Sequence, residues 1–89
     1  MTELYVIVVE AGLSGNAYGA TISTHGPTDL STARATLQAA LRGELPEIHK
    51  LYRKGMIVRV SEDQYLNIGT GLAGAKQTRL TVAAVVSET

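Results

Sequence analysis

Basic side chains cluster in the middle of the chain, on a segment whose pattern predicts a short helix. Residues 34–60 contain six Lys and Arg residues but only two acidic ones. At helical spacing, the segment from Pro46 to Gly55 places its basic and apolar side chains on opposite faces. The basic face consists of His49, Lys50, Arg53 and Lys54, and it is flanked in sequence by Arg42 and Arg59. Such a cluster could contact phosphates or an acidic protein surface.

Three interpretations of this basic face stay open. The exposed face of any surface helix is charged, and cations also suit a helix C-terminus. The two functional interpretations are an acidic protein partner and a nucleic acid. Sheet domains that bind single-stranded RNA stack its bases on exposed aromatic residues. The chain has four Tyr and no Phe or Trp, which favours the protein partner over the nucleic acid.

A glycine-rich segment, residues 69–76, contains the spacing Gly-x-Gly-x-x-Gly followed by a lysine. Backbone amides of such a loop bind phosphate where the loop leads into a helix. Here the next predicted element is a strand from Thr78, and the chain has no βαβ unit. We therefore expect a hairpin loop and no nucleotide or other cofactor. A partner would contact this loop through Gly71, Gly74 and Lys76.

Catalytic and metal-binding patterns are not found in the sequence. The chain contains no Cys and only two His residues, His25 and His49. Neither has a metal-ligand partner at helical spacing or a neighbour that marks a nucleophile. We expect a protein that is not an enzyme and that holds no metal.

The periodicity of apolar residues predicts five strands and two helices in the order ββααβββ. Gly26-Pro27 is expected to end the second strand, and Thr28, Asp29 and Ser31 are candidate N-caps of the first helix. Gly43 is the expected end of that helix, and Pro46 suits the start of the second. The expected strands are residues 4–9, 18–24, 56–60, 65–68 and 78–86, and the expected helices are residues 30–41 and 46–54.

These elements indicate a single small α+β domain over residues 1–89, with an antiparallel sheet packed on one face by the two helices. The composition, 45% hydrophobic and 18% charged, is that of a globular protein. No apolar run is long enough for a membrane span, and the start does not resemble an export signal. We therefore expect a cytoplasmic protein with no membrane contact. Because the core of so short a chain is small, a homodimer is also expected.

The last predicted strand, residues 78–86, is apolar on both faces. At the edge of the sheet such a strand needs a cover, because its free backbone groups can pair with another chain. We expect it to form a dimer interface or to accept a strand from a partner.

The opening hairpin, the segment Thr28–Ser31 and the alanine-rich helix after it resemble small antitoxins with a partial ribonuclease-H-like fold. This resemblance covers less than half of the chain, which lacks the Asp-Leu-Pro-Gly segment of those proteins. In size and in lacking catalytic motifs the chain is also similar to accessory proteins of phages and mobile elements, inhibitors included. We expect a protein-binding module that blocks a partner's functional surface; the alternative is a small nucleic-acid-binding domain that uses the same basic face.

Overall fold

The computed structural model describes residues 3–12, 21–52, 54–69 and 76–87, and within these it contains one helix and five strands. The α+β class is confirmed, but the order is ββαβββ, so the prediction of a second helix is wrong. The elements are β1 (Tyr5–Ala11), β2 (Thr21–Thr28), α1 (Leu30–Leu41), β3 (Gly55–Ser61), β4 (Gln64–Gly69) and β5 (Lys76–Ala84). No helix in the described ranges is long and apolar enough to cross a membrane.

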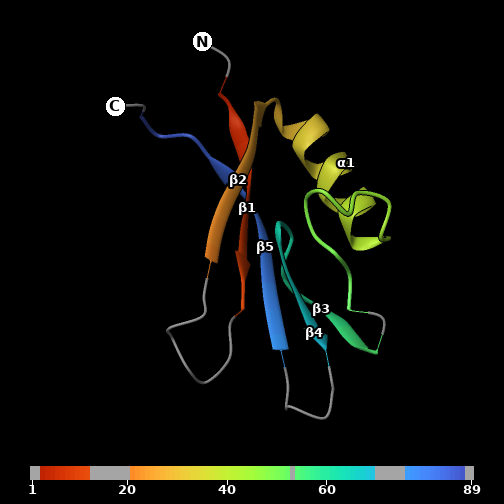
Figure 1. Ribbon diagram of the computed structural model, residues 1–89. Helices are drawn as coiled ribbons and strands as arrows, with labels where there is room; N and C mark the ends of the chain where they lie inside the picture. The colour runs from red at the N-terminus through yellow and green to blue at the C-terminus, as the bar shows by residue number, and fades with distance from the viewer. Residues whose placement is uncertain (1–2, 13–20, 53, 70–75, 88–89) are drawn as a thin grey trace.

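The five strands form one antiparallel sheet in the order β2-β1-β5-β4-β3 (Figure 1). The last strand therefore lies at the centre of the sheet, and the expectation that it forms an edge is wrong. It is flanked by β1 and β4, and its two faces differ, because Gln77, Arg79 and Thr81 lie on the side away from the helix. On its helix side Thr78, Leu80 and Val82 are buried.

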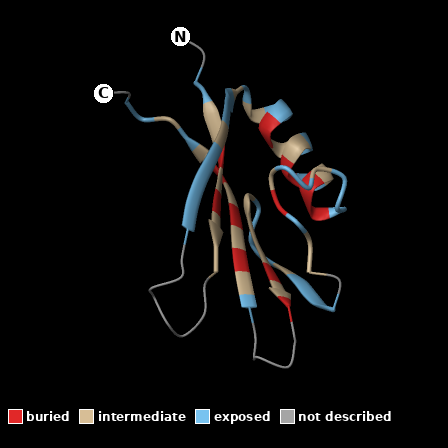
Figure 2. Cartoon of the chain, in the orientation of Figure 1, coloured by how far each residue is buried: buried red, intermediate tan, exposed pale blue. Residues whose placement is uncertain are grey.

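Helix α1 covers one face of the sheet over β1 and β5 and forms most of the core with them (Figures 1 and 2). Asp29 caps its N-terminus, because Asp29 Oδ1 accepts a hydrogen bond of 2.8 Å from the Thr32 amide. The same bond lowers the pKa of Asp29. Gly43, at φ 78°, follows the last turn, as the sequence predicts. The buried apolar residues are Ile7, Val9, Ala33, Leu37, Ala40, Leu41, Leu80 and Val82.

In place of the predicted helix over residues 46–54, residues 46–52 and 54 form turns and irregular chain. Only one helical turn forms, in which the amides of Ile48 and His49 both donate to Leu45 O. Helical continuation would require the Tyr52 amide to donate to Ile48 O. That amide instead donates to Asn67 Oδ1 at 2.8 Å. A side chain of the sheet thus competes successfully for the backbone of this segment.

Strand β2 runs through Gly26-Pro27 instead of ending there, so the predicted end of this strand is wrong. The peptide bond between the two residues is cis. Proline is tolerated here because β2 is an edge strand, where its missing amide hydrogen interrupts no further pairing.

An ion pair joins α1 to the turn between β3 and β4. The Arg34 guanidinium donates to both carboxylate oxygens of Asp63, at 2.8 and 3.0 Å. Asp63 O in turn accepts from the Val82 amide at 2.8 Å. One residue of the turn therefore contacts both the helix and the central strand. The Arg34 guanidinium holds the pKa of Asp63 below its usual value.

We expect the contribution of this ion pair to stability to disappear in acid. The pKa of Asp63 is lower in the folded chain than in the unfolded chain, so the pair stabilises the fold above about pH 4, and the effect is lost as the pH falls further. Urea denaturation of the wild type and of Asp63→Asn should give different free energies of unfolding at pH 6 and converging ones at pH 2.5. A difference that stays constant over this range would contradict the assignment.

Candidate functional site

The described residues of the predicted basic face, His49, Lys50 and Lys54, do not share one exposed face in the structure. His49 is buried, with 7% of its surface exposed, so the prediction that it lies on the solvent side is wrong. Lys50 and Lys54 are exposed. Arg53 lies outside the described residues. The reason is the missing helix, because without 3.6-residue periodicity these positions no longer point the same way.

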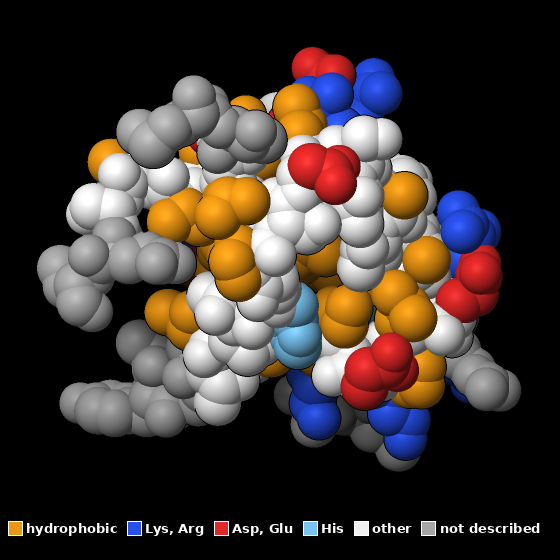
Figure 3. Space-filling model, turned by 90° about the horizontal axis from the view of Figure 1, so that it is seen from above, with side chains coloured by type: hydrophobic (Ala, Val, Ile, Leu, Met, Phe, Trp, Pro, Cys, Tyr) orange, Lys and Arg blue, Asp and Glu red, His pale blue; other side chains and the backbone are white. Residues whose placement is uncertain are grey.

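The two flanking arginines also lie apart. Arg42 caps α1 and forms an ion pair with Glu44, whereas Arg59 is exposed on edge strand β3. On the face shown in Figure 3, Lys and Arg side chains lie next to acidic ones and form no continuous basic surface. Of the predicted loop contacts, Gly71 and Gly74 lie outside the described residues. Lys76 is exposed at the start of β5, opposite Gly69.

A buried polar network holds residues 49–52 against the sheet. Asn67 on β4 is completely buried, and its Oδ1 also lies 2.8 Å from His49 Nε2. Because the Tyr52 amide can only donate, the Asn67 atom that it meets must be the acceptor Oδ1. Nε2 of His49 therefore carries a hydrogen and donates it. Asn67 Nδ2 donates to Met56 O at 3.3 Å, so both ends of the amide are used.

Tyr52 completes this network on the side of β5. The hydroxyl of Thr78, which is completely buried, donates to the Tyr52 hydroxyl at 3.2 Å. The Tyr52 ring lies against Gly69, where an added Cβ would be 2.7 Å from Cγ of the ring. His49 meets the same ring edge-on, with 5.7 Å between the ring centroids. Glycine at position 69 is thus required by the close approach of the tyrosine.

Replacing Asn67 with Ala should destabilise the fold by about 3 kcal/mol, because the buried Tyr52 amide and His49 ring lose their acceptor. The measurement is urea denaturation at pH 7. Gln64→Ala is the matched control, since Gln64 is half-buried on the same strand and bonds only to Thr81 among the described side chains. Equal destabilisation by the two variants would contradict the role assigned to Asn67.

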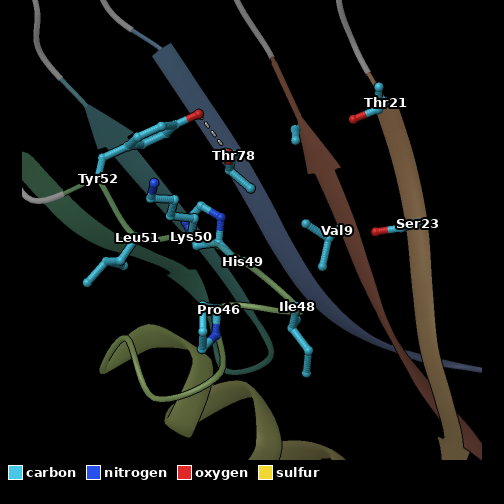
Figure 4. A pocket seen from close by; sticks show the side chains of 11 residues that line it. Val9, Thr21, Ser23, Pro46, Ile48, His49, Lys50, Leu51, Tyr52 and Thr78 are labelled. Carbon is cyan, nitrogen blue, oxygen red and sulfur yellow. Dashed lines mark hydrogen bonds between the residues drawn. The ribbon is translucent and has the colours of Figure 1, made fainter.

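The network forms one wall of an open groove with a volume of about 640 Å³ (Figure 4). This wall consists of residues 46 and 48–52. Val9, Ala11 and Thr78 line the groove from β1 and β5, and Thr21 and Ser23 line it from β2. The sheet surface of the groove is the part beyond the C-terminal end of α1 (Figures 1 and 4). The groove therefore exists because α1 is too short to cover the whole face.

The lining of the groove is mixed, with apolar side chains beside hydrogen-bonding groups. Apolar side chains come from β1 and from the wall, in particular Pro46, Ile48 and Leu51. Lys50 is the one charged side chain among the described lining residues. The hydroxyls of Thr21 and Ser23 lie on the opposite border (Figure 4). Such a surface suits an apolar group that carries or adjoins a negative charge.

The sequence analysis identified only part of this site. It singled out His49 and Lys50, but it gave no role to Asn67, Thr78 or Ser23. One available signal was the polar Asn67 between Leu66 and Ile68, since a buried position on an apolar strand requires hydrogen-bond partners. Among the described residues no three His, Asp or Glu side chains gather as a metal site would require. Comparison with protein family models, curated proteins and solved structures finds no match to this chain.

Proposed function

We propose that this protein is a non-enzymatic protein-binding module, and that the groove beside His49 is its contact site. The observation that carries the proposal is a groove whose wall sets Lys50 beside the apolar side chains of Pro46, Ile48 and Leu51. The volume of about 640 Å³ is that of a site for a large side chain or a short peptide segment. The polar network behind the wall supports the proposal because it holds the wall in place before a partner binds.

The charge of the groove indicates the chemistry of the partner. Lys50 forms no ion pair with a described acidic residue, whereas Arg34, Arg42 and Arg79 each do. An exposed cation beside apolar surface favours a partner that inserts an apolar side chain next to an Asp or Glu. In this proposal Lys50 contacts an acidic partner, as the sequence analysis expected, but it does so as a single residue and not as part of a helix face.

The proposal is tested with two pairs of matched variants. Ser23→Trp should fill the groove from β2, whereas Thr24→Trp, one residue further on, places the same ring on the other face of the sheet. Lys50→Glu reverses the charge at the groove, and Lys76→Glu makes the same change outside it, at the exposed lysine that the sequence analysis expected to contact a partner. Loss of binding in Lys76→Glu and not in Lys50→Glu would place the contact at that loop instead of the groove. Each tagged variant is used to capture partners from a lysate of the native host, and the captured protein is then purified and titrated by calorimetry.

We expect Ser23→Trp and Lys50→Glu each to weaken binding of the captured protein by about tenfold or more, and the two controls to retain it. Equal binding by Ser23→Trp and Thr24→Trp would overturn the assignment of the groove. Captured material that disappears on nuclease treatment, with an affinity that falls steeply with salt, would instead support the alternative of a nucleic-acid-binding domain.

An inhibitor or accessory role, such as those of phage and mobile-element proteins, follows from the proposal if the occupied surface of the partner is its functional one. The purified partner's activity, measured with and without the module, tests this step. Loss of activity with the wild type and not with Ser23→Trp is the expected result.

A further inference from the structure

Edge strand β3 exposes apolar side chains, and its register with β4 is regular up to Arg59 and shifts between Arg59 and Ser61. Met56, Ile57 and Val60 are 58%, 43% and 52% exposed. Among the described strands β3 pairs with β4 alone, so its other side has free backbone groups. The opposite edge, β2, has Pro27 and several Ser and Thr residues instead. An exposed apolar edge strand is a site for pairing with another chain unless it is covered.

We propose that β3 pairs with β3 of a second copy of this chain, antiparallel and centred on Val58. In this register the side chains on the regular part of β3 are complementary. Ile57 lies opposite Arg59 of the second copy, Met56 lies opposite Val60, and Lys54 and Glu62, which flank the strand at its two ends, come to the same end of the pair. Apolar residues thus meet apolar ones, cations meet an anion or an aliphatic side chain, and no like charges lie directly opposite.

A second copy fits this edge because the strand is complementary to itself. A two-fold interface uses the same residues twice, so it requires such self-complementarity. Centring the pairing on Arg59 would set two arginines opposite each other, which disfavours that register. Glu62 is available for Lys54, since its side chain is 79% exposed despite its contact with Arg34 at 3.4 Å. The eight buried apolar residues in the described ranges form a small core, to which a shared sheet would add buried apolar surface.

The inferred dimer leaves the proposed groove free. The groove is lined from β2, at the edge of the sheet opposite to β3. Two copies joined at β3 would form one continuous sheet with a groove in each half. The dimer would then be bivalent toward a partner that is itself dimeric or repeated. The dimer does not depend on the proposed function, because the two surfaces share no residue.

Single cysteine variants test the register directly, because the chain has no Cys of its own. Residues directly opposite in an antiparallel pair have Cα atoms about 4.5 or 5.5 Å apart, and both distances suit a disulfide. Val58→Cys, on the two-fold axis, should form a disulfide-linked dimer of the intact chain under mild oxidation. Met56→Cys is the control: residue 56 is more exposed, but two such residues would lie about 13 Å apart along the strands.

Two substitutions of opposite charge at position 57 provide the second measurement. Ile57→Glu places a carboxylate opposite Arg59 of the second copy, whereas Ile57→Lys places a cation there, and each substitution acts twice in the dimer. Light scattering and sedimentation should show a wild-type dimer, with the dissociation constant at least about tenfold higher in Ile57→Lys than in Ile57→Glu. A monomeric wild type at all concentrations, equal weakening by both charges, or equal cross-linking of Met56→Cys would each overturn the proposal.

Discussion

The buried amide of Asn67 is the interaction on which the rest of this structure depends. Its oxygen accepts from the Tyr52 amide and the His49 ring, and its nitrogen donates to Met56 O. A backbone amide that is removed from water needs an acceptor, and leaving it without one costs more than the bond itself contributes. The chain after α1 therefore follows the position of this side chain, and its helical propensity does not decide its conformation.

The path of that segment produces both the groove and its boundaries. If this segment were helical, the Tyr52 amide would donate to Ile48 O and could not donate to Asn67. Because α1 ends at Leu41, it leaves part of the sheet uncovered beside this wall (Figure 1). A short helix and a segment that is anchored by a side chain together create the one concave surface to which we assign a function.

Ion pairs determine which charges remain available at the surface. Arg34 and Arg79 each form two hydrogen bonds with a carboxylate that lies far away in sequence, Asp63 and Glu10. The Arg79 side chain holds the pKa of Glu10 below its usual value. These arginines stabilise the arrangement of strands and helix, and they are not free for a partner. Part of the excess of basic residues over 34–60 is therefore explained by ion pairs within the fold, and the exposed cations that the structure describes do not form one cluster.

The sequence by itself determined the elements whose signals are local. Apolar alternation indicated the strands, and the Asp29 cap, the apolar spacing of residues 30–41 and Gly43 indicated the helix that is observed. For the helix these signals suffice because its hydrogen bonds close within four residues, whereas a strand signal shows that a strand forms and leaves its partners open. The same reasoning predicted a helix over 46–54 from Pro46, Gly55 and an amphipathic pattern, and there it failed.

Only the tertiary structure decided the features that depend on residues distant in sequence. The capture of the Tyr52 amide by Asn67 joins positions fifteen residues apart, and no local propensity encodes it. The same holds for strand order, which places β5 at the centre and β3 at the edge. An apolar strand can lie at the centre of a sheet, or it can lie at the edge and pair with another chain. Its own residues do not distinguish the two positions. The groove and the exposed edge follow from these long-range pairings, because each is a surface that the folded chain leaves uncovered.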